Sequence, residues 1–143
     1  MTEENELVLI DSNVLVYAFD SSEQKKHKIA KEILDALSAS GKGVLSIQNL
    51  AEFYSLVTKK IERPLEQYLA KDIVENMCNS FKVLHYDEKT IINAIETSTA
   101  FNTSFWDALL AATMKENYIE KIFTEDEKDF RKMPWLEVEN PFK

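Results

Sequence analysis

The chain has 143 residues, 45% of them hydrophobic and 29% charged, which fits one domain with a sizeable core. With 25 acidic against 17 basic residues, its net charge of −8 argues against binding of nucleic acid through a basic surface. Two glycines exclude a P-loop and a dinucleotide-binding fingerprint, a single cysteine excludes an internal disulfide and a cysteine-based zinc site, and two histidines exclude a His-rich metal site.

The first part of the chain predicts a buried strand followed by two helices. The continuous apolar run over residues 6–10 predicts a strand buried on both faces, as in a parallel sheet. A short helix is expected over residues 14–19. Ser22 is typical of an N-cap for a longer amphipathic helix, which Gly41 is expected to end.

The middle of the chain repeats this alternation. Residues 44–46 predict a second strand, and the apolar stripe over residues 48–60 predicts a helix. Pro64 is typical of the first helical position, so the next helix is expected to begin there and to reach about residue 79. Residues 82–84 predict a third strand.

The last part of the chain contains its most apolar helix. Before it, Asp87 is expected to cap a helix whose isoleucines face the core: Ile91, Ile92 and Ile95. Residues 104–117 predict a helix that is hydrophobic nearly all round and therefore buried. Residues 121–124 and 136–138 predict a fourth and a weaker fifth strand. This alternation predicts a three-layer α/β fold, in which helices flank a mostly parallel sheet of four to five strands.

The sequence also bears on the location of the protein. The first six residues are acidic and lack the apolar stretch of a signal peptide. No apolar run approaches the ~20 residues needed to span a bilayer. We therefore expect a cytoplasmic protein.

Two aspartates follow predicted strands directly. Asp11 comes after the first strand, and Asp126 comes after the fourth. Because the carboxyl ends of parallel strands meet at one edge of a sheet, we expect both carboxylates at that edge. Each also has a plainer explanation, since Asp11 suits the N-cap of a helix and Asp126 lies in an acidic turn.

Two further acids lie on predicted helices near strand ends. Asp107 is in the first turn of the apolar helix, where Ser104 and Asp107 also match a capping box. Glu52 lies beside the apolar stripe of its helix, where a solvated surface position would explain it equally well. Taken together, the four acids form a set of oxygen ligands without histidine or cysteine, which suits Mg²⁺ or Mn²⁺.

The same residues carry a resemblance to a known family. Four segments resemble, in order, the motifs of the PIN domain family, and more narrowly of its VapC-type toxin branch: residues 11–17, 49–53 around Glu52, 105–112 and 124–126. The segment 105–112 is the most specific of them. Asn140-Pro141-Phe142 resembles a common ending of the family. The match covers essentially the whole chain.

The resemblance implies a single PIN-like domain over residues 1–143 that acts as a metal-dependent endoribonuclease. It implies that four acids converge in one pocket as catalytic residues and ligands of one or two Mg²⁺ or Mn²⁺ ions: Asp11, Glu52, Asp107 and Asp126. Polar neighbours would orient these acids or a water molecule: Asn13, Ser104 and Thr124. Asp129 is a second candidate for the fourth acid, and we prefer Asp126 for its Thr-x-Asp spacing. The metal would lower the pKa of a bound water, and the resulting hydroxide would attack a phosphodiester in line.

The resemblance also implies an RNA substrate, a homodimer and a cognate antitoxin that inserts a basic residue into the pocket. Three aromatic residues belong either to an exposed partner groove or to the core: Tyr54, Tyr68 and Phe81. Two basic clusters could guide a phosphate backbone or could be solvated helix faces. They are Lys25, Lys26, Lys28 and Lys31, and then Lys128, Arg131 and Lys132.

Two other functions compete with a ribonuclease. A non-catalytic PIN-like module would bind RNA or protein without cutting, but the presence of all four acids argues against it. A phosphotransfer enzyme with an aspartyl nucleophile would typically have a second acid two residues after that nucleophile. Asn13 occupies this position, which argues against such an enzyme.

Overall fold

In the computed structural model, which describes residues 6–143, five strands form one sheet. The strands are β1 (Val8–Ile10), β2 (Gly43–Ser46), β3 (Lys82–Leu84), β4 (Lys121–Phe123) and β5 (Glu137–Glu139). The helices are α1 (Ser12–Tyr17), α2 (Gln24–Ser40), α3 (Ile47–Lys59), α4 (Gln67–Ser80), α5 (Glu88–Phe101), α6 (Phe105–Glu116) and α7 (Glu127–Phe130). Residues 1–5, which contributed to the argument against a signal peptide, lie outside the described residues. Within residues 6–143, no helix has the length and apolar character to cross a membrane.

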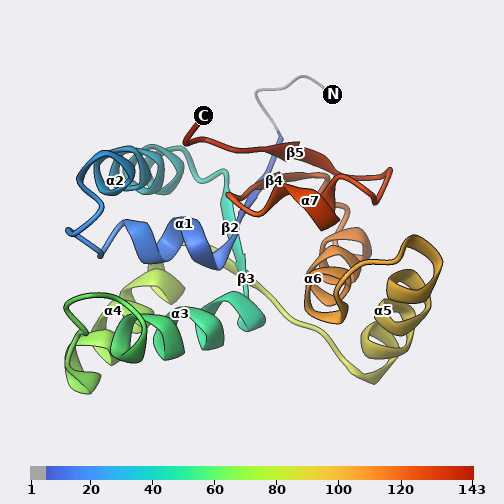
Figure 1. Ribbon diagram of the computed structural model, residues 1–143, viewed down its shortest axis with the longest axis horizontal. Helices are drawn as coiled ribbons and strands as arrows, with labels where there is room; N and C mark the ends of the chain where they lie inside the picture. Colours follow the sequence, from blue (N-terminus) through green and yellow to red (C-terminus); the bar gives the residue numbers. More distant parts are fainter. Residues whose placement is uncertain (1–5) are drawn as a thin grey trace.

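The sheet has the order β3-β2-β1-β4-β5, and all of its pairings are parallel. Helices α1 to α4 lie on one side of it and α5 and α6 on the other (Figure 1). The predicted three-layer α/β fold is therefore confirmed. The chain builds β1, β2 and β3 outward in one direction, and then returns to place β4 on the free side of β1. This reversal leaves the carboxyl ends of β1 and β4 side by side, where ligands bind in open parallel sheets.

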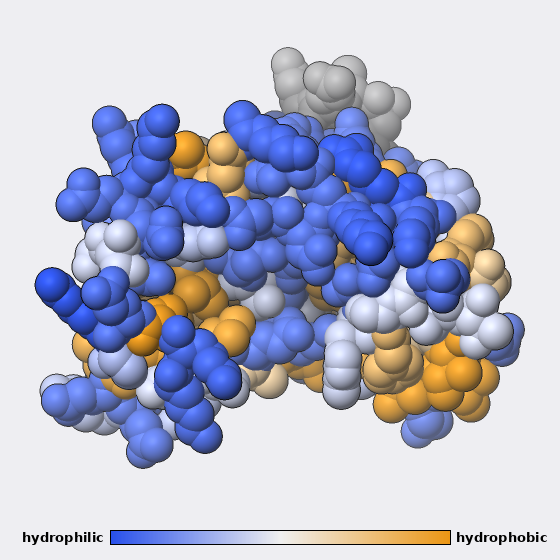
Figure 2. All heavy atoms as spheres, viewed as in Figure 1, coloured by the Kyte–Doolittle hydropathy of each residue, from blue (hydrophilic) through white to orange (hydrophobic). Residues whose placement is uncertain are grey.

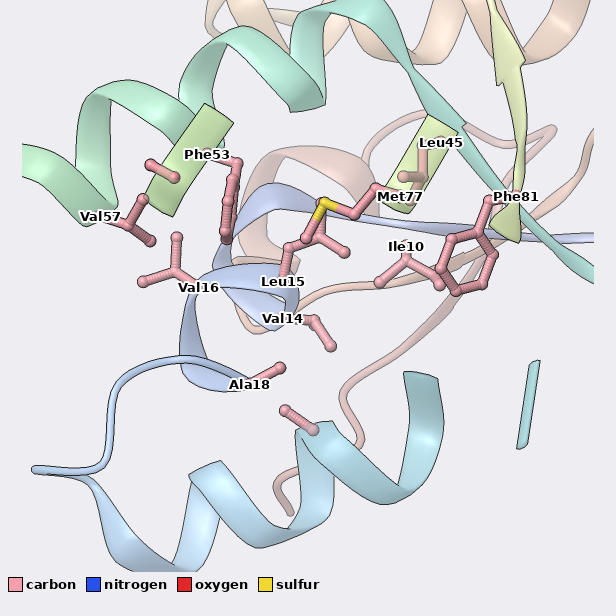
Figure 3. Packing of buried hydrophobic residues seen from close by; sticks show 12 residues of the cluster. Ile10, Val14, Leu15, Val16, Ala18, Leu45, Phe53, Val57, Met77 and Phe81 are labelled. Atoms are coloured by element: carbon pink, nitrogen blue, oxygen red, sulfur yellow. The ribbon is translucent and has the colours of Figure 1, made fainter. Parts of the chain in front are cut away.

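Successive residues of the central strands point to opposite faces of the sheet, and each face has its own core. Ile10 and Leu45 pack with residues of α1, α3 and α4, among them Phe53 (Figure 3). Leu9 and Val44, one residue earlier in each strand, pack instead with α6. These strands are buried on both faces, which explains their continuous apolar sequence.

Two predicted helix starts were wrong. Helix α2 begins at Gln24, and its N-cap residue Glu23 makes no side-chain capping bond. The Ser22 hydroxyl instead donates a 2.6 Å hydrogen bond to Asp20, in a local turn. Pro64 precedes α4 by three residues and is not its first residue. By contrast, the predicted end of α2 is confirmed, because Gly41 follows it with a φ of 72°.

The isoleucines of α5 were predicted to face the core, and this was wrong. Ile91, Ile92 and Ile95 are 38%, 56% and 53% exposed. The fully buried residues of this helix are Thr90 and Ala94, whose small side chains let α5 pack closely on α6. Figure 2 shows the resulting hydrophobic patch over α5, at the lower right of that view.

The three aromatic residues considered for a partner groove have different positions. Phe81 is buried in the core, against Gly43 at the start of β2, where a Cβ atom would lie only 2.8 Å from the Phe81 ring. Tyr68 is 68% exposed. Tyr54 is partly buried and lines a groove together with Tyr68. Only the two tyrosines therefore remain candidates for a partner groove.

Candidate active site

Asp11 is a buried carboxylate at the carboxyl end of β1. One of its oxygens accepts a 2.7 Å hydrogen bond from the Ser12 N–H, so Asp11 also caps α1 as the plainer explanation predicted. The same oxygen accepts a bond from the Asn49 side chain at 3.3 Å. The other accepts a bond from the Thr124 hydroxyl at 2.7 Å and one from the Asn13 amide at 3.4 Å. Donors from three separate segments therefore fix this carboxylate.

Thr124 links the ends of β1 and β4. Its side chain is fully buried, and its hydroxyl accepts hydrogen bonds from the Asp126 N–H at 3.0 Å and the Asn13 amide at 3.2 Å. The side-chain oxygen of Asn13 accepts a 3.1 Å hydrogen bond from the Glu125 N–H. Asn13 and Thr124 thus hold the turn after β4 against Asp11.

Helix α3 contributes Glu52 and one residue that the sequence analysis missed. The Glu52 carboxylate accepts a 3.2 Å hydrogen bond from the Ser12 hydroxyl. Asn49, which is fully buried, contacts Asp11 and completes a capping box with Ser46 at the start of α3. The only signal for Asn49 was its place three residues after a serine at a strand end, which indicates a cap more directly than a site residue.

Helix α6 contributes Asp107. Its N–H donates a 3.1 Å hydrogen bond to the Ser104 hydroxyl, so Ser104 caps α6. The predicted capping box is only half formed, because the Ser104 N–H binds Asp129 and not the Asp107 side chain. Asp129, the second candidate for the fourth acid, has other partners. It accepts a 2.8 Å bond from the Ser104 N–H and lies 3.4 Å from the Lys132 ammonium group. Asp129 therefore already has partners that tie α7 to the start of α6.

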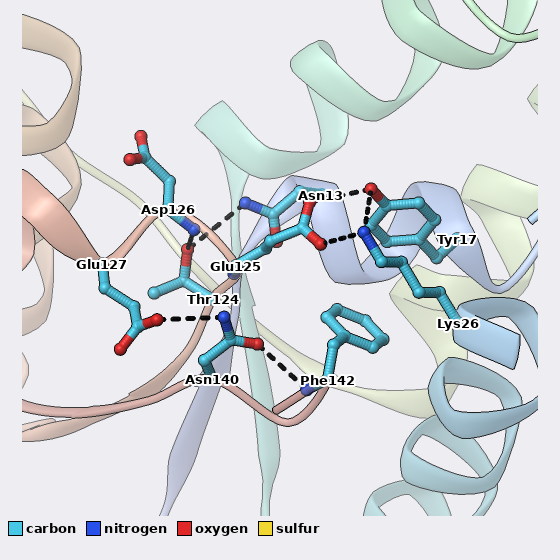
Figure 4. Close-up of polar contacts among 9 residues, drawn as sticks. All are labelled: Asn13, Tyr17, Lys26, Thr124, Glu125, Asp126, Glu127, Asn140 and Phe142. Atoms are coloured by element: carbon cyan, nitrogen blue, oxygen red, sulfur yellow. Dashed lines mark hydrogen bonds and ion pairs between the residues drawn. The ribbon is translucent and has the colours of Figure 1, made fainter.

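The acidic run after β4 alternates in direction. Glu125 turns toward Tyr17 and Lys26, whereas Glu127 turns toward Asn140 (Figure 4). Glu127 also pairs with the Lys143 ammonium group at 2.7 Å, and its pKa is lowered to about 2 by this contact. The Asp126 side chain is exposed and points away from both glutamates (Figure 4). Asp126 thus does not share the partners of Glu125 and Glu127.

The electrostatics connect Asp11, Glu52, Asp107 and Asp126, which we call the acid cluster. Burial raises the pKa of Asp11, and its hydrogen bonds oppose this rise. Burial followed by the charge of Asp11 raises the pKa of Glu52. Burial, then repulsion from Asp126, Asp11 and Asp129, raises the pKa of Asp107 to about 7. The acids therefore repel one another.

The donor chemistry of the acid cluster fits a hard divalent cation, because its ligands would all be carboxylate oxygens. A cation would also relieve the repulsion that raises these pKa values. Within residues 6–143, however, no three His, Cys, Asp or Glu side chains converge closely enough to hold a metal ion as they stand. The metal site expected from the sequence stays a prediction.

Several members of the two basic clusters contact neighbouring acids. Lys26 pairs with Glu125 at 2.6 Å, and Arg131 pairs with Glu127 at 2.6 Å. Lys132 also pairs with Asp129. Three of the seven cations in the two clusters therefore have an ion-pair partner that explains their position without a nucleic acid. A role of the clusters in guiding phosphates stays a prediction.

Comparison with known proteins adds a family and a set of folds. The PIN domain family matches residues 8–136. A toxin–antitoxin complex from Klebsiella pneumoniae has a TM-score of 0.68 at 20% identity, over 94% of this chain and 97% of that chain. VapC20 from Mycobacterium tuberculosis, described as a toxin that cleaves the sarcin–ricin loop, has a TM-score of 0.67 at 18% identity, over 87% and 93%. DNA-bound VapBC from Salmonella typhimurium has a TM-score of 0.69 at 16% identity, over 95% and 98%. No curated protein sequence matches the chain.

These structures show that the fold is that of VapC-type toxins. The family match includes the ends of β1 and β4, the start of α3 and the start of α6, which are the segments that carry the acid cluster. The resemblance inferred from the sequence is thereby confirmed at the level of the family and the fold. The chain belongs to the PIN domain family.

Proposed function

We propose that residues 1–143 act as a single PIN domain and as a metal-dependent endoribonuclease, the toxin of a type II toxin–antitoxin pair. The observation that carries this proposal is Asp11, a buried carboxylate at the reversal of the sheet order. Its donors come from α1, α3 and the turn after β4, and its charge raises the pKa of Glu52 and Asp107. A purely structural helix cap needs no such surroundings.

Asp11, Glu52, Asp107 and Asp126 would hold Mg²⁺ or Mn²⁺. When bound, the cation would supply hydroxide from water near neutral pH and would neutralise the phosphodiester. Thr124 and Asn49 keep the Asp11 carboxylate in one orientation through their hydrogen bonds. We assign the fourth position to Asp126, because Asp129 is engaged by Ser104 and Lys132.

Asp107 differs from the other acids in its protonation without a cation. Burial and repulsion from the neighbouring acids raise its pKa to about 7, so it is partly protonated near neutral pH when no cation is bound. A bound cation would favour the ionised carboxylate, which is the form that binds metal. Ser104 fixes the start of α6 and so the direction of this side chain.

RNA is the substrate we propose, in the cytoplasm. The description of VapC20 as a toxin that cleaves the sarcin–ricin loop supports an RNA target for this chain. The net charge of −8 also supports a narrow target over indiscriminate cutting, because the chain lacks the excess of cations that gives non-specific affinity.

An antitoxin is the protein partner we propose, as in the complexes from Klebsiella and Salmonella. The supporting feature is an apolar groove of about 580 Å³ between α3 and α4. Its lining includes Leu50, Ala51, Tyr54 and Tyr68. Because Leu50 and Ala51 directly precede Glu52, a segment seated in this groove can extend toward the acid cluster.

A homodimer is the assembly we propose, through the exposed isoleucines of α5. Ile91, Ile92 and Ile95 share one face of the helix and carry no charge. Burial of such side chains against a second copy would gain roughly 1 kcal/mol or more for each. Sedimentation of the wild type and of an Ile92→Glu variant tests this assembly, which the variant should disrupt.

The nuclease proposal is tested by cleavage of a labelled RNA panel with single-stranded and hairpin members, in Mg²⁺, Mn²⁺ or excess EDTA. Wild type should cut only with metal, and Asp11→Asn should not cut. The matched control is Asp35→Asn, which removes an exposed carboxylate from α2 and should cut like wild type. Cleavage that survives Asp11→Asn would refute the site. Mn²⁺ binding by calorimetry without any cleavage would favour a binding module or a missing target.

A further inference from the structure

The turn after β4 is held by a lysine of α2. Lys26 Nζ lies 2.6 Å from one oxygen of Glu125, and the Tyr17 hydroxyl donates a 2.7 Å hydrogen bond to the other (Figure 4). The Lys26 ammonium group also lies 5.0 Å from the centre of the Tyr17 ring. That ring packs edge to face against Phe142, with centroids 5.1 Å apart. Two donors on different helices therefore clamp Glu125.

The stability of α2 does not explain a lysine at this position. Lys26 lies in the first turn of α2, where the helix macrodipole disfavours a cation. The N-cap residue Glu23 makes no side-chain hydrogen bond that would compensate. An acidic side chain in this turn would stabilise the helix better. The ion pair with Glu125 explains a lysine at this position, whereas the stability of the helix does not.

Glu125 is connected to the acid cluster through the backbone of the turn. Its N–H donates a 3.1 Å hydrogen bond to the side-chain oxygen of Asn13, and the Asn13 side chain in turn contacts both Asp11 and Thr124. The next N–H, that of Asp126, binds the Thr124 hydroxyl at 3.0 Å. A displacement of Glu125 would therefore disturb two hydrogen bonds that orient acids of the cluster.

We infer that Lys26 is a positioning residue of the acid cluster: it holds the Glu125 carboxylate turned away from Asp126 and thereby fixes the turn that carries Thr124 and Asp126. Without the lysine, Glu125 would be an unpaired carboxylate directly beside Asp126, and repulsion between the two would loosen the turn. Tyr17 contributes the second contact. The inference deepens the proposed function and rests on it only for the consequences for metal and RNA.

The direct test is backbone amide exchange at Glu125 and Asp126 in the metal-free protein. Lys26→Met removes the charge and keeps most of the length of the side chain. It should speed exchange at both amides by about fivefold, the scale of one well-formed ion pair. Lys26→Arg keeps the positive charge and should therefore keep exchange at both amides as slow as in wild type. The matched control is Lys89→Met, another lysine in a first helical turn, which lies in α5 and should leave both amides unchanged.

A second test measures Mn²⁺ affinity by calorimetry, where charge and position predict opposite signs. Loss of a cation near an acidic site should tighten Mn²⁺ binding if only charge matters. If Lys26 positions the turn, binding should weaken by about fivefold. The double variant Lys26→Met/Glu125→Gln should recover wild-type affinity, because the introduced glutamine amide still accepts the Tyr17 hydrogen bond and adds no carboxylate.

The outcomes separate this inference from the proposed function. Unchanged amide exchange in Lys26→Met, or tighter Mn²⁺ binding, overturns the positioning role even if the protein is a nuclease. Faster exchange at both amides in Lys26→Met, together with slow exchange in Lys26→Arg and in the double variant Lys26→Met/Glu125→Gln, supports it. Absence of Mn²⁺ binding by wild type would refute the metal site, and the exchange measurement would still decide on the role of Lys26.

Discussion

Replacing Asp107 by asparagine should stabilise the metal-free protein, although it should abolish cleavage. In the folded chain, burial and the repulsion from Asp126 and Asp11 raise the pKa of Asp107 to about 7, against an ordinary value of 3.8. Ionisation of this group therefore opposes folding. Asparagine has nearly the same shape and no charge, so Asp107→Asn removes the repulsion without creating a cavity.

The magnitude follows from the two pKa values. At about 1.4 kcal/mol for each pH unit between them, the full cost of the charge would be ~4 kcal/mol. The Asp107 side chain is only partly buried, so screening by water reduces the expected cost to about 2 kcal/mol. For a chain of this size that corresponds to a rise in the melting temperature of roughly 4–8 °C.

The pH dependence of the stability gain distinguishes an effect of the Asp107 charge from other sources of stability. Because the folded pKa is the higher one, the cost is absent below pH 3.8, grows as the pH rises, and is complete above about 7. Thermal melts in EDTA should therefore show a larger gain for Asp107→Asn at pH 8 than at pH 5. Added Mn²⁺ should stabilise wild type by mass action and the variant much less.

Two results would refute this reasoning. A variant no more stable than wild type at pH 8 would mean that repulsion does not raise the free energy of the folded state. An equal gain at pH 5 and pH 8 would mean that the gain has another origin than the charge. Asp35→Asn, an exposed carboxylate on α2, should show no change at either pH.

Three further predictions concern other parts of the molecule. Thr124→Val keeps the volume but removes the hydroxyl that binds Asp11 at 2.7 Å, so cleavage should fall by at least ~10-fold and unfolding by urea should show a loss of about 1–2 kcal/mol. Phe53→Ala empties the centre of the core beneath α1 and should cost ~3–5 kcal/mol in the same assay. Tyr17→Phe keeps the ring against Phe142 but loses the 2.7 Å bond to Glu125, so amide exchange at Glu125 should rise by about twofold, less than for Lys26→Met.

The fold could be predicted from the sequence where local patterns determine it. The apolar run ending at Ile10 indicated a doubly buried strand, and Gly41 indicated a helix end, because both depend on nearby residues. The isoleucines of α5 show the limit of this reasoning. Their spacing defines a face, but only the packing of Thr90 and Ala94 on α6 decides that another face is covered.

The candidate site was predictable to a similar extent. Strand order places Asp11 and the turn at Asp126 together once the sheet is known to be parallel. Asn49 was missed, because its capping role and its bond to Asp11 coincide in one side chain. The pairing of Lys26 with Glu125 joins residues far apart in the sequence, and no periodicity reports such a contact.

The reversal of the sheet order has a consequence for synthesis of the protein. Asp11 is translated before Thr124 and the turn that orients it, which come only with β4. A nascent chain that has reached α5 can pair β1, β2 and β3, and it carries Asp11 and Glu52 without the partners from α6 and β4. On the ribosome, where RNA is most concentrated, the protein is therefore expected to stay inert until β4 docks beside β1. This late contact between distant segments also makes docking of β4 the expected slow step of folding.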